Sequence, residues 1–186
     1  YEQEFTCEVA GVRRAFTRTG VVAMVALTDF SERVVFPHEY TLSGPKVDRY
    51  EHLEATRLNE GQIFGLLSDN DGAIYRLLQS LKQGDAVGTA EDDNGVRHNL
   101  YRCSDAAAID AFVAAARKST VLIADGHHRY ETALSFYRDH NNDPAYSRVM
   151  MTLVSMADPG LVIRSFHRLV RRRPHDRQVD MLAELR

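Results

Sequence analysis

The sequence has few of the features that mark several large classes of protein. Its 186 residues include only two cysteines, Cys7 and Cys103, too few for a disulfide scaffold, which favours a reducing cytoplasm. No apolar run approaches the roughly 20 residues that a membrane-spanning helix needs, and the longest, Gly20 to Leu27, is only strand-sized. Neither sign of charge dominates, with 23 Lys and Arg against 26 Asp and Glu. We therefore expect neither a membrane nor a nucleic acid as partner.

Both ends of the chain interrupt a pattern. Tyr1 is not an initiator Met and lies inside an alternating stretch, and Arg186 lies inside a helical pattern. We therefore expect a fragment of a longer protein. Residues 1–170 are predicted to form a single α/β domain, and residues 171–186 to begin a C-terminal helical region.

Strand and helix patterns alternate along the chain, and an Asn-Gly hairpin signal interrupts them at residues 94–95. The fold class is thus predicted to be α/β to α+β, with a mixed sheet and flanking helices. The hairpin strands are expected at Ala86–Ala90 and Val96–Tyr101, and a last short strand at Leu161–Ile163. Helices are expected from Lys46, from Asp105 with Ser104 as its N-cap, and from Arg129.

The densest group of polar residues lies at a predicted strand-to-helix turn, Asp125-Gly126-His127-His128-Arg129. A helix N-terminus leaves backbone N–H groups without intrahelical partners and carries about half a positive charge. Gly126 lets the backbone approach a ligand, and the next three side chains add donors, so the turn predicts a phosphate site. Asp125 could cap the helix, orient a histidine or bind Mg²⁺ that bridges to phosphate. The alternative is a structural turn with solvated histidines.

A second polar cluster, His38-Glu39, follows a short strand that Pro37 ends and leads to Lys46 and Arg49. Phosphoryl transfer needs charge neutralisation and a carboxylate that accepts the proton of the attacking hydroxyl. Glu39 is therefore the candidate general base, with His38 beside it. Lys46 and Arg49 are candidates for neutralising phosphate charge, or they are simply solvated on the first turn of a surface helix.

A third pair, His167-Arg168, could add donors to the same pocket if its strand lies nearby. The following Arg171–Arg173 run is interpreted as a solvated edge or linker. No metal site is predicted, because adjacent histidines such as His127 and His128 point in different directions and one metal rarely takes both.

The segment Ile123–Ala133, which reads Ile-Ala-Asp-Gly-His-His-Arg-Tyr-Glu-Thr-Ala, resembles the signature of a bacterial and archaeal family known as domain of unknown function 1015. Pro37-His38-Glu39, Asp158-Pro159-Gly160-Leu161 and His167-Arg168 fit the same family in the same order. Family members carry further N-terminal and C-terminal regions, which agrees with a fragment. The resemblance does not by itself supply a reaction.

More distantly, the turn is similar to the phosphate-binding motif of the ParB/sulfiredoxin superfamily, which implies a ParB/sulfiredoxin-like fold around residues 36–140. Sulfiredoxins place a nucleophilic Cys directly after the glycine, where this chain has His127. Chromosome-partition proteins need a basic helix-turn-helix region, which the sequence does not show. The resemblance therefore implies a small-molecule phosphotransferase similar to the free-serine kinases.

Two functions follow as expectations. In the first, the chain is a kinase of a small hydroxyl-bearing metabolite such as serine, and Mg²⁺ accompanies a nucleotide or pyrophosphate. In the second, it is a non-catalytic nucleotide- or metabolite-binding regulatory module. In both, the partner is a small phosphate-bearing molecule. The distance from Glu39 to the helix end at Arg129 discriminates between them, because only the enzyme needs a carboxylate beside the ligand.

Overall fold

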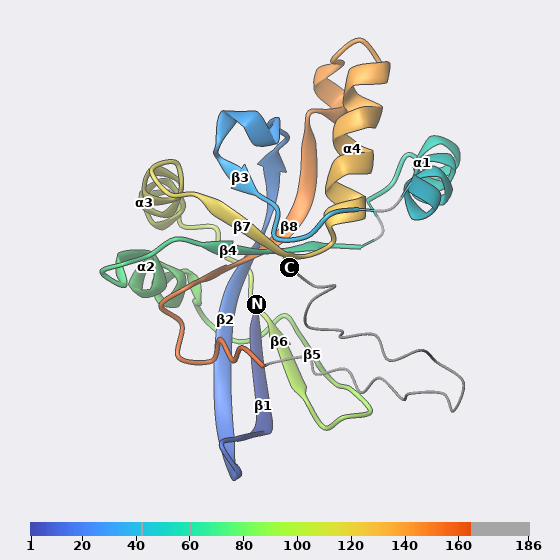
Figure 1. Cartoon of the computed structure of the whole chain (residues 1–186). Coiled ribbons are helices and arrows are strands. Elements are labelled where there is room, and N and C mark those ends of the chain that lie inside the picture. Colours follow the sequence, from blue (N-terminus) through green and yellow to red (C-terminus); the bar gives the residue numbers. More distant parts are fainter. Residues whose placement is uncertain (42, 60, 165–186) are drawn as a thin grey trace, which may run out of the picture.

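The structure is a computed structural model that describes residues 1–41, 43–59 and 61–164. Over these residues, an eight-stranded mixed sheet in the order β3-β7-β4-β8-β2-β1-β6-β5 is flanked by four α-helices (Figure 1). This confirms the expected α/β architecture. The strands are β1 Glu2–Val9, β2 Val12–Ala26, β3 Val35–Phe36, β4 Ile63–Leu67, β5 Gly88–Glu91, β6 Arg97–Leu100, β7 Val121–Asp125 and β8 Arg148–Ser155. The helices are α1 Ser43–Thr56, α2 Ala73–Leu81, α3 Ala106–Ala116 and α4 His127–Asp139.

The long strand β2 joins the two halves of the sheet. Its first part pairs antiparallel with β1 up to Thr19, and its second part, Gly20–Ala26, pairs antiparallel with β8. Gly20 lies where the partner changes, and a Cβ there would be 2.9 Å from the carbonyl oxygen of Leu153. A larger residue would push the strands apart, so glycine permits the close approach.

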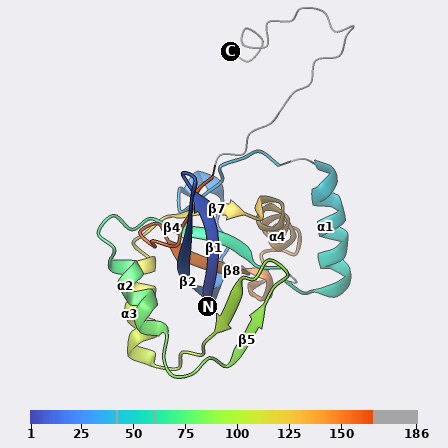
Figure 2. The same cartoon turned by 90° about the horizontal axis from the view of Figure 1, so that it is seen from below.

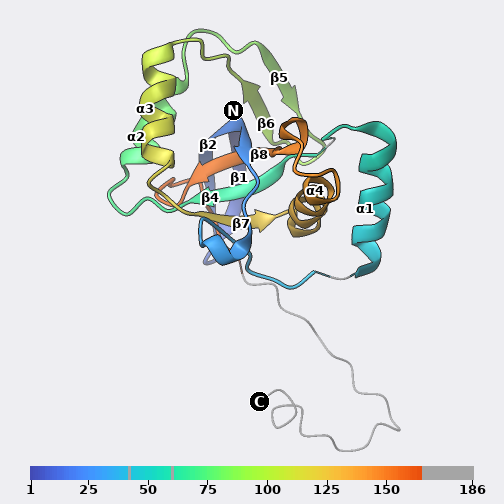
Figure 3. The ribbon, with the colours of Figure 1, turned by 90° about the horizontal axis from the view of Figure 1, so that it is seen from above.

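The core lies between the sheet and the helices. Ile63, Ile123 and Met151 supply fully buried side chains from β4, β7 and β8, and Tyr130 and Leu78 supply buried side chains from α4 and α2. Figures 2 and 3 show α2 and α3 together at one side of the molecule, with α4 and α1 at the other. Helix α1 packs mainly against α4. Over the described residues, no helix combines the length and apolar character needed to cross a membrane.

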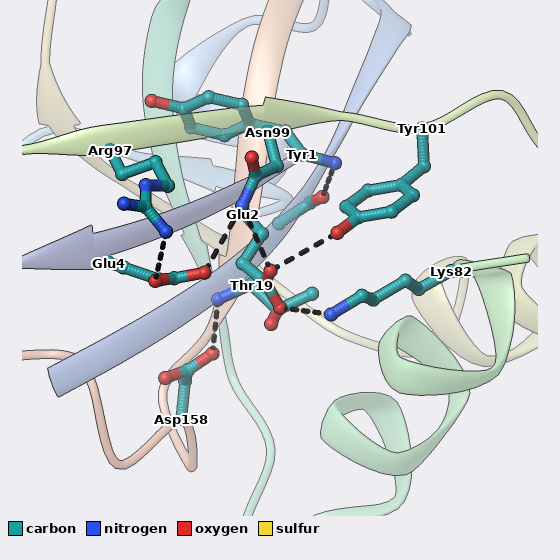
Figure 4. Close-up of polar contacts among 10 residues, drawn as sticks. Tyr1, Glu2, Glu4, Thr19, Lys82, Arg97, Asn99, Tyr101 and Asp158 are labelled. Atoms are coloured by element: carbon teal, nitrogen blue, oxygen red, sulfur yellow. Dashed lines mark hydrogen bonds and ion pairs between the residues drawn. The ribbon is translucent and has the colours of Figure 1, made fainter. Parts of the chain in front are cut away.

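A buried carboxylate ties β1 to α2 and to the segment after β6 (Figure 4). Glu2 accepts hydrogen bonds from Lys82 Nζ at 2.5 Å and from the Tyr101 hydroxyl at 3.3 Å. Burial by itself raises the pKa of Glu2, but the hydrogen bonds and the charge of Lys82 outweigh it and lower the pKa. Nearby, the Asp158 carboxylate accepts the backbone N–H of Thr19 at 2.9 Å.

Four local expectations need correction. Helix α1 begins at Ser43 rather than Lys46. Helix α3 has Asp105, not Ser104, as its N-cap, because the Asp105 carboxylate accepts the N–H groups of Ala107 and Ala108. Helix α4 begins at His127 rather than Arg129, because the left-handed Gly126 (φ 97°) turns the chain directly after β7. Leu161–Ile163 is not a strand, and the chain turns at Asp158 instead.

Gly160 generates a test of the packing between this turn and β2. A Cβ at Gly160 would lie 2.2 Å from the carbonyl oxygen of Thr17 and 2.8 Å from the Cα of Arg18. We expect Gly160→Ala to lower the free energy of unfolding, measured in urea, by about 3 kcal/mol, the upper end of overpacking costs. Gly88→Ala is the control, because its Cβ would have nothing within 4 Å. Equal stability of the two variants would contradict the close approach.

Candidate functional site

The two polar clusters of the sequence meet at one edge of the sheet. Strand β3 pairs parallel with β7, Val35 opposite Val121 and Phe36 opposite Leu122. Since parallel strands end at the same edge, His38-Glu39 after β3 lies beside the turn that follows β7. His38 Nδ1 donates to the carbonyl of Ile123 at 2.6 Å, which fixes the ring across the end of β7.

His127 is the buried centre of this arrangement, only 1% exposed. Its Nε2 accepts the backbone N–H of His38 at 3.2 Å, so the neutral ring carries its proton on Nδ1. That Nδ1 lies 3.0 Å from Glu39 Oε1, but out of line with the N–H direction, so it forms no hydrogen bond. The ring edge also contacts the ring of His38, with 4.5 Å between centroids.

The charge state of His127 is set mainly by its burial. Burial and the nearby His38 lower the pKa of His127, and the carboxylates of Glu39, Asp125 and Glu131 oppose the shift without reversing it. His127 is therefore a neutral donor beside a carboxylate that is itself largely exposed, with 56% of the Glu39 side chain accessible.

Glu131 belongs to the site and was missed by the sequence reasoning. It accepts hydrogen bonds from Lys46 Nζ at 2.8 Å and from Thr41 Oγ1 at 2.7 Å. Burial would raise the pKa of Glu131, but these donors outweigh it and lower the pKa, and the charge of His128 contributes in the same direction. Its spacing of four residues from His127, one helical turn on the same face, was the available signal.

Arg129 is held against the glycine turn by its own neighbours. Its Nη2 donates to Asp125 Oδ2 at 2.5 Å, and its Nη1 donates to the backbone carbonyl of Gln62. A Cβ at Gly126 would lie 3.0 Å from Nη2, so the guanidinium lies close over the glycine. Asp125 thus pairs with Arg129 rather than capping α4, which has no side-chain cap.

Two separate cavities lie beside the N-terminal half of α4, one lined by Glu131 and the other by Arg129. The larger, of about 470 Å³, is lined by His38, Glu39, Thr41 and Glu131 together with Phe30, Pro37 and Tyr40. The smaller, of about 60 Å³, is lined by Arg49 and Arg129 among others. The two cationic candidates on α1 therefore lie at different cavities. Lys46 pairs with Glu131, which lines the larger cavity, and Arg49 lines the smaller one. His167 and Arg168, the basic run after them and the proposed helical region 171–186 lie outside the described residues.

A family model described as "Protein of unknown function (DUF1015)" matches residues 1–186. The chain belongs to this family. Neither the curated proteins nor the solved structures contain a match to it.

The described residues of the DUF1015 site offer a cation few protein ligands. Within the described ranges, no group of three or more His, Cys, Asp or Glu side chains is arranged to hold a metal ion. Glu39 and Glu131 line one cavity, and Asp125 is ion-paired with Arg129. This set fits a Mg²⁺ ion held mostly by phosphate oxygens and water, which needs only one or two carboxylates.

The buried His127 predicts how stability depends on pH. Its pKa is lowered in the folded state from the usual 6.5, so the unfolded chain takes up a proton first as the pH falls. The stability that His127 contributes is present above pH 6.5 and is lost as the pH falls from there towards the folded-state pKa. We expect His127→Gln, which retains an acceptor for the His38 N–H, to lose less free energy of unfolding than wild type between pH 7 and 5. If wild type and His127→Gln lost the same free energy of unfolding, measured in urea, between pH 7 and 5, burial would not be what keeps His127 neutral.

Proposed function

We propose that this DUF1015 chain transfers a phosphoryl group to the hydroxyl of a small metabolite, in the manner of the free-serine kinases. The observation that carries the proposal is the position of Glu39, whose carboxylate lies 3.0 Å from Nδ1 of His127, the first residue of α4. A carboxylate that can accept a proton is thus combined with a helix end whose amides attract phosphate.

The larger cavity suits a small hydroxyl-bearing substrate. Its volume of about 470 Å³ is within the range of small-molecule sites, roughly 300–1,000 Å³. Glu39 takes the proton of the attacking hydroxyl, and Thr41 and Glu131 line the same space. His38 Nδ1 is used by the Ile123 carbonyl, so in the neutral ring Nε2 retains its lone pair and can accept a substrate hydroxyl.

Phosphate charge is met by the turn and by the neighbouring cations. Gly126 to Arg129 offer the first-turn amides, which have no acceptor inside the helix. His128 and Lys46 are both close enough to Glu131 to lower the pKa of its carboxyl group, so positive charge is available beside the same helix. A Mg²⁺ ion that arrives with a nucleotide or pyrophosphate would be held by Glu131, which leaves Glu39 to act as the base, and would neutralise phosphate charge.

A non-catalytic binding module is the second candidate, and one observation favours it. Arg129 and Lys46 are already ion-paired, with Asp125 and Glu131 respectively. These pairs reduce the positive charge available to stabilise a transferring phosphoryl group. A module that only binds a phosphate-bearing metabolite has less need of that charge.

The first experiment is a thermal-shift panel on the chain with nucleotides, pyrophosphate and phospho-amino acids. A ligand that binds only the folded state raises the melting temperature by mass action. Each ligand found is then supplied with serine and other small hydroxyl compounds, and phosphorylated product is measured. Binding without product for all donors would support the binding module over the kinase.

Glu39→Gln separates chemistry from binding. Because the amide cannot accept the hydroxyl proton, we expect turnover to fall by a factor of about 10²–10⁴ while the dissociation constant of the phosphate donor stays unchanged. Glu51→Gln, an exposed position on α1, removes the same charge and should leave turnover unchanged. Undiminished turnover in Glu39→Gln would remove Glu39 as the base.

A further inference from the structure

A third cavity, of about 340 Å³, lies beside α2 and α3 and shares no lining residue with the two cavities near α4. Apolar side chains form most of its wall, among them Val21 from β2, Leu78 from α2 and Phe112 from α3, and we call it the apolar cavity. Its volume is within the range of small-molecule sites, roughly 300–1,000 Å³. Because α1 and α4 lie at the other side of the molecule (Figures 2 and 3), a ligand here would be separate from the phosphoryl-transfer site.

Large apolar side chains remain exposed in the apolar cavity. Leu100, Ile109 and Val113 are 47%, 38% and 37% exposed, and all three line its wall. Single exposed apolar residues are ordinary on a protein surface, but several that share one concave wall are typical of a site that a ligand covers. The wall therefore indicates a ligand with a largely apolar body.

The charges of the wall indicate that this ligand is uncharged. Among the described residues that line the cavity, only Glu2 and Lys82 have charged side chains. They pair at 2.5 Å, and the hydrogen bond to Glu2 raises the pKa of Lys82, so the two opposite charges are both retained and cancel. A charged ligand would leave a charge uncompensated in this partly buried place. Tyr1 also lines the cavity, but burial lowers the pKa of its terminal amine from the usual 8.0, so the amine is largely neutral above pH 8.

Lys82 offers the polar contact at this end of the cavity (Figure 4). Glu2 takes one of its three N–H donors, and 36% of the Lys82 side chain is accessible. The Glu2 carboxylate is itself occupied, because it accepts from Lys82, Tyr101 and Asn99, and only 7% of its side chain is accessible. Within this group of side chains a donor is available and the acceptor is already used. This combination suits a carbonyl oxygen, which accepts a hydrogen bond and has no proton to place.

We propose that the apolar cavity binds an uncharged small molecule with an apolar body and a carbonyl oxygen, such as a ketone or an ester. The carbonyl accepts a hydrogen bond from Lys82, and the apolar body covers Leu100, Ile109 and Val113. This binding function is additional to phosphoryl transfer and does not depend on it.

Titration calorimetry above pH 8 with three eight-carbon probes, 2-octanone, octanoate and octylamine, tests the charge of the ligand. We expect 2-octanone to bind. Octanoate and octylammonium should each bind about tenfold more weakly or worse, because each brings an uncompensated charge beside the Glu2–Lys82 pair. No binding of 2-octanone, or equal or tighter binding of either charged probe, would overturn the proposal.

An introduced carboxylate tests the location of the site. We expect Ile109→Asp to weaken 2-octanone binding about tenfold or more, because it places a charge in the apolar wall. Ala111→Asp is the matched control, because it adds the same charge at an exposed position of α3 that does not line the cavity. Val113→Asp is a second wall variant, used if the melting temperature of Ile109→Asp falls. Wild-type affinity in the wall variants would overturn the location.

Infrared spectroscopy of bound 2-octanone tests the contact with Lys82. A hydrogen bond weakens the C=O bond, so we expect the carbonyl band to lie at lower wavenumber on the wild-type protein than in an apolar solvent. Lys82→Met removes the donor and should return the band towards its position in that solvent, while Glu2 keeps its bonds from Tyr101 and Asn99. An unshifted band on wild type, or a band that stays shifted in Lys82→Met, would overturn the assignment of Lys82 as the donor.

Discussion

The parallel pairing of β3 with β7 is the constraint on which the rest of the site depends. Only two residue pairs form it, yet it places the ends of both strands at one edge. The His38 backbone then reaches His127 Nε2, the His38 ring reaches the Ile123 carbonyl, and Glu39 comes beside the start of α4. An antiparallel β3 would carry His38 and Glu39 to the opposite edge of the sheet.

Local patterns were sufficient for most elements and for the strand-to-helix turn, because chain direction, glycine placement and polarity are properties of neighbouring residues, but they wrongly predicted a strand at Leu161–Ile163. The sequence reasoning also grouped His38 and Glu39 with that turn, and the structure places them together. It could not predict that Lys46 and Arg49 lie at different cavities, because their positions depend on how α1 packs against α4. That packing is set by tertiary contacts, which leave no periodic signal in one sequence.

The cationic side chains near the start of α4 are already paired with carboxylates, so the turn is more than a series of free hydrogen-bond donors. Arg129 with Asp125 and Lys46 with Glu131 form ion pairs across the first turn of α4. Such pairs hold the side chains in place before any ligand arrives, which reduces the ordering cost of binding. The pairing of Asp125 was open in the sequence, because a carboxylate in that position is equally suited to capping the helix.

The continuity of β2 has a consequence for how the chain comes apart. One strand supplies the partner of β1 and the partner of β8, so neither half of the sheet keeps all its hydrogen bonds if that strand leaves. The β1–β6–β5 side and the β8–β4–β7–β3 side are consequently linked in a single cooperative unit. Cleavage of the backbone within β2 would separate the segment paired with β1 from the segment paired with β8. Cleavage in the exposed β5–β6 connection would leave β2 and this linkage intact.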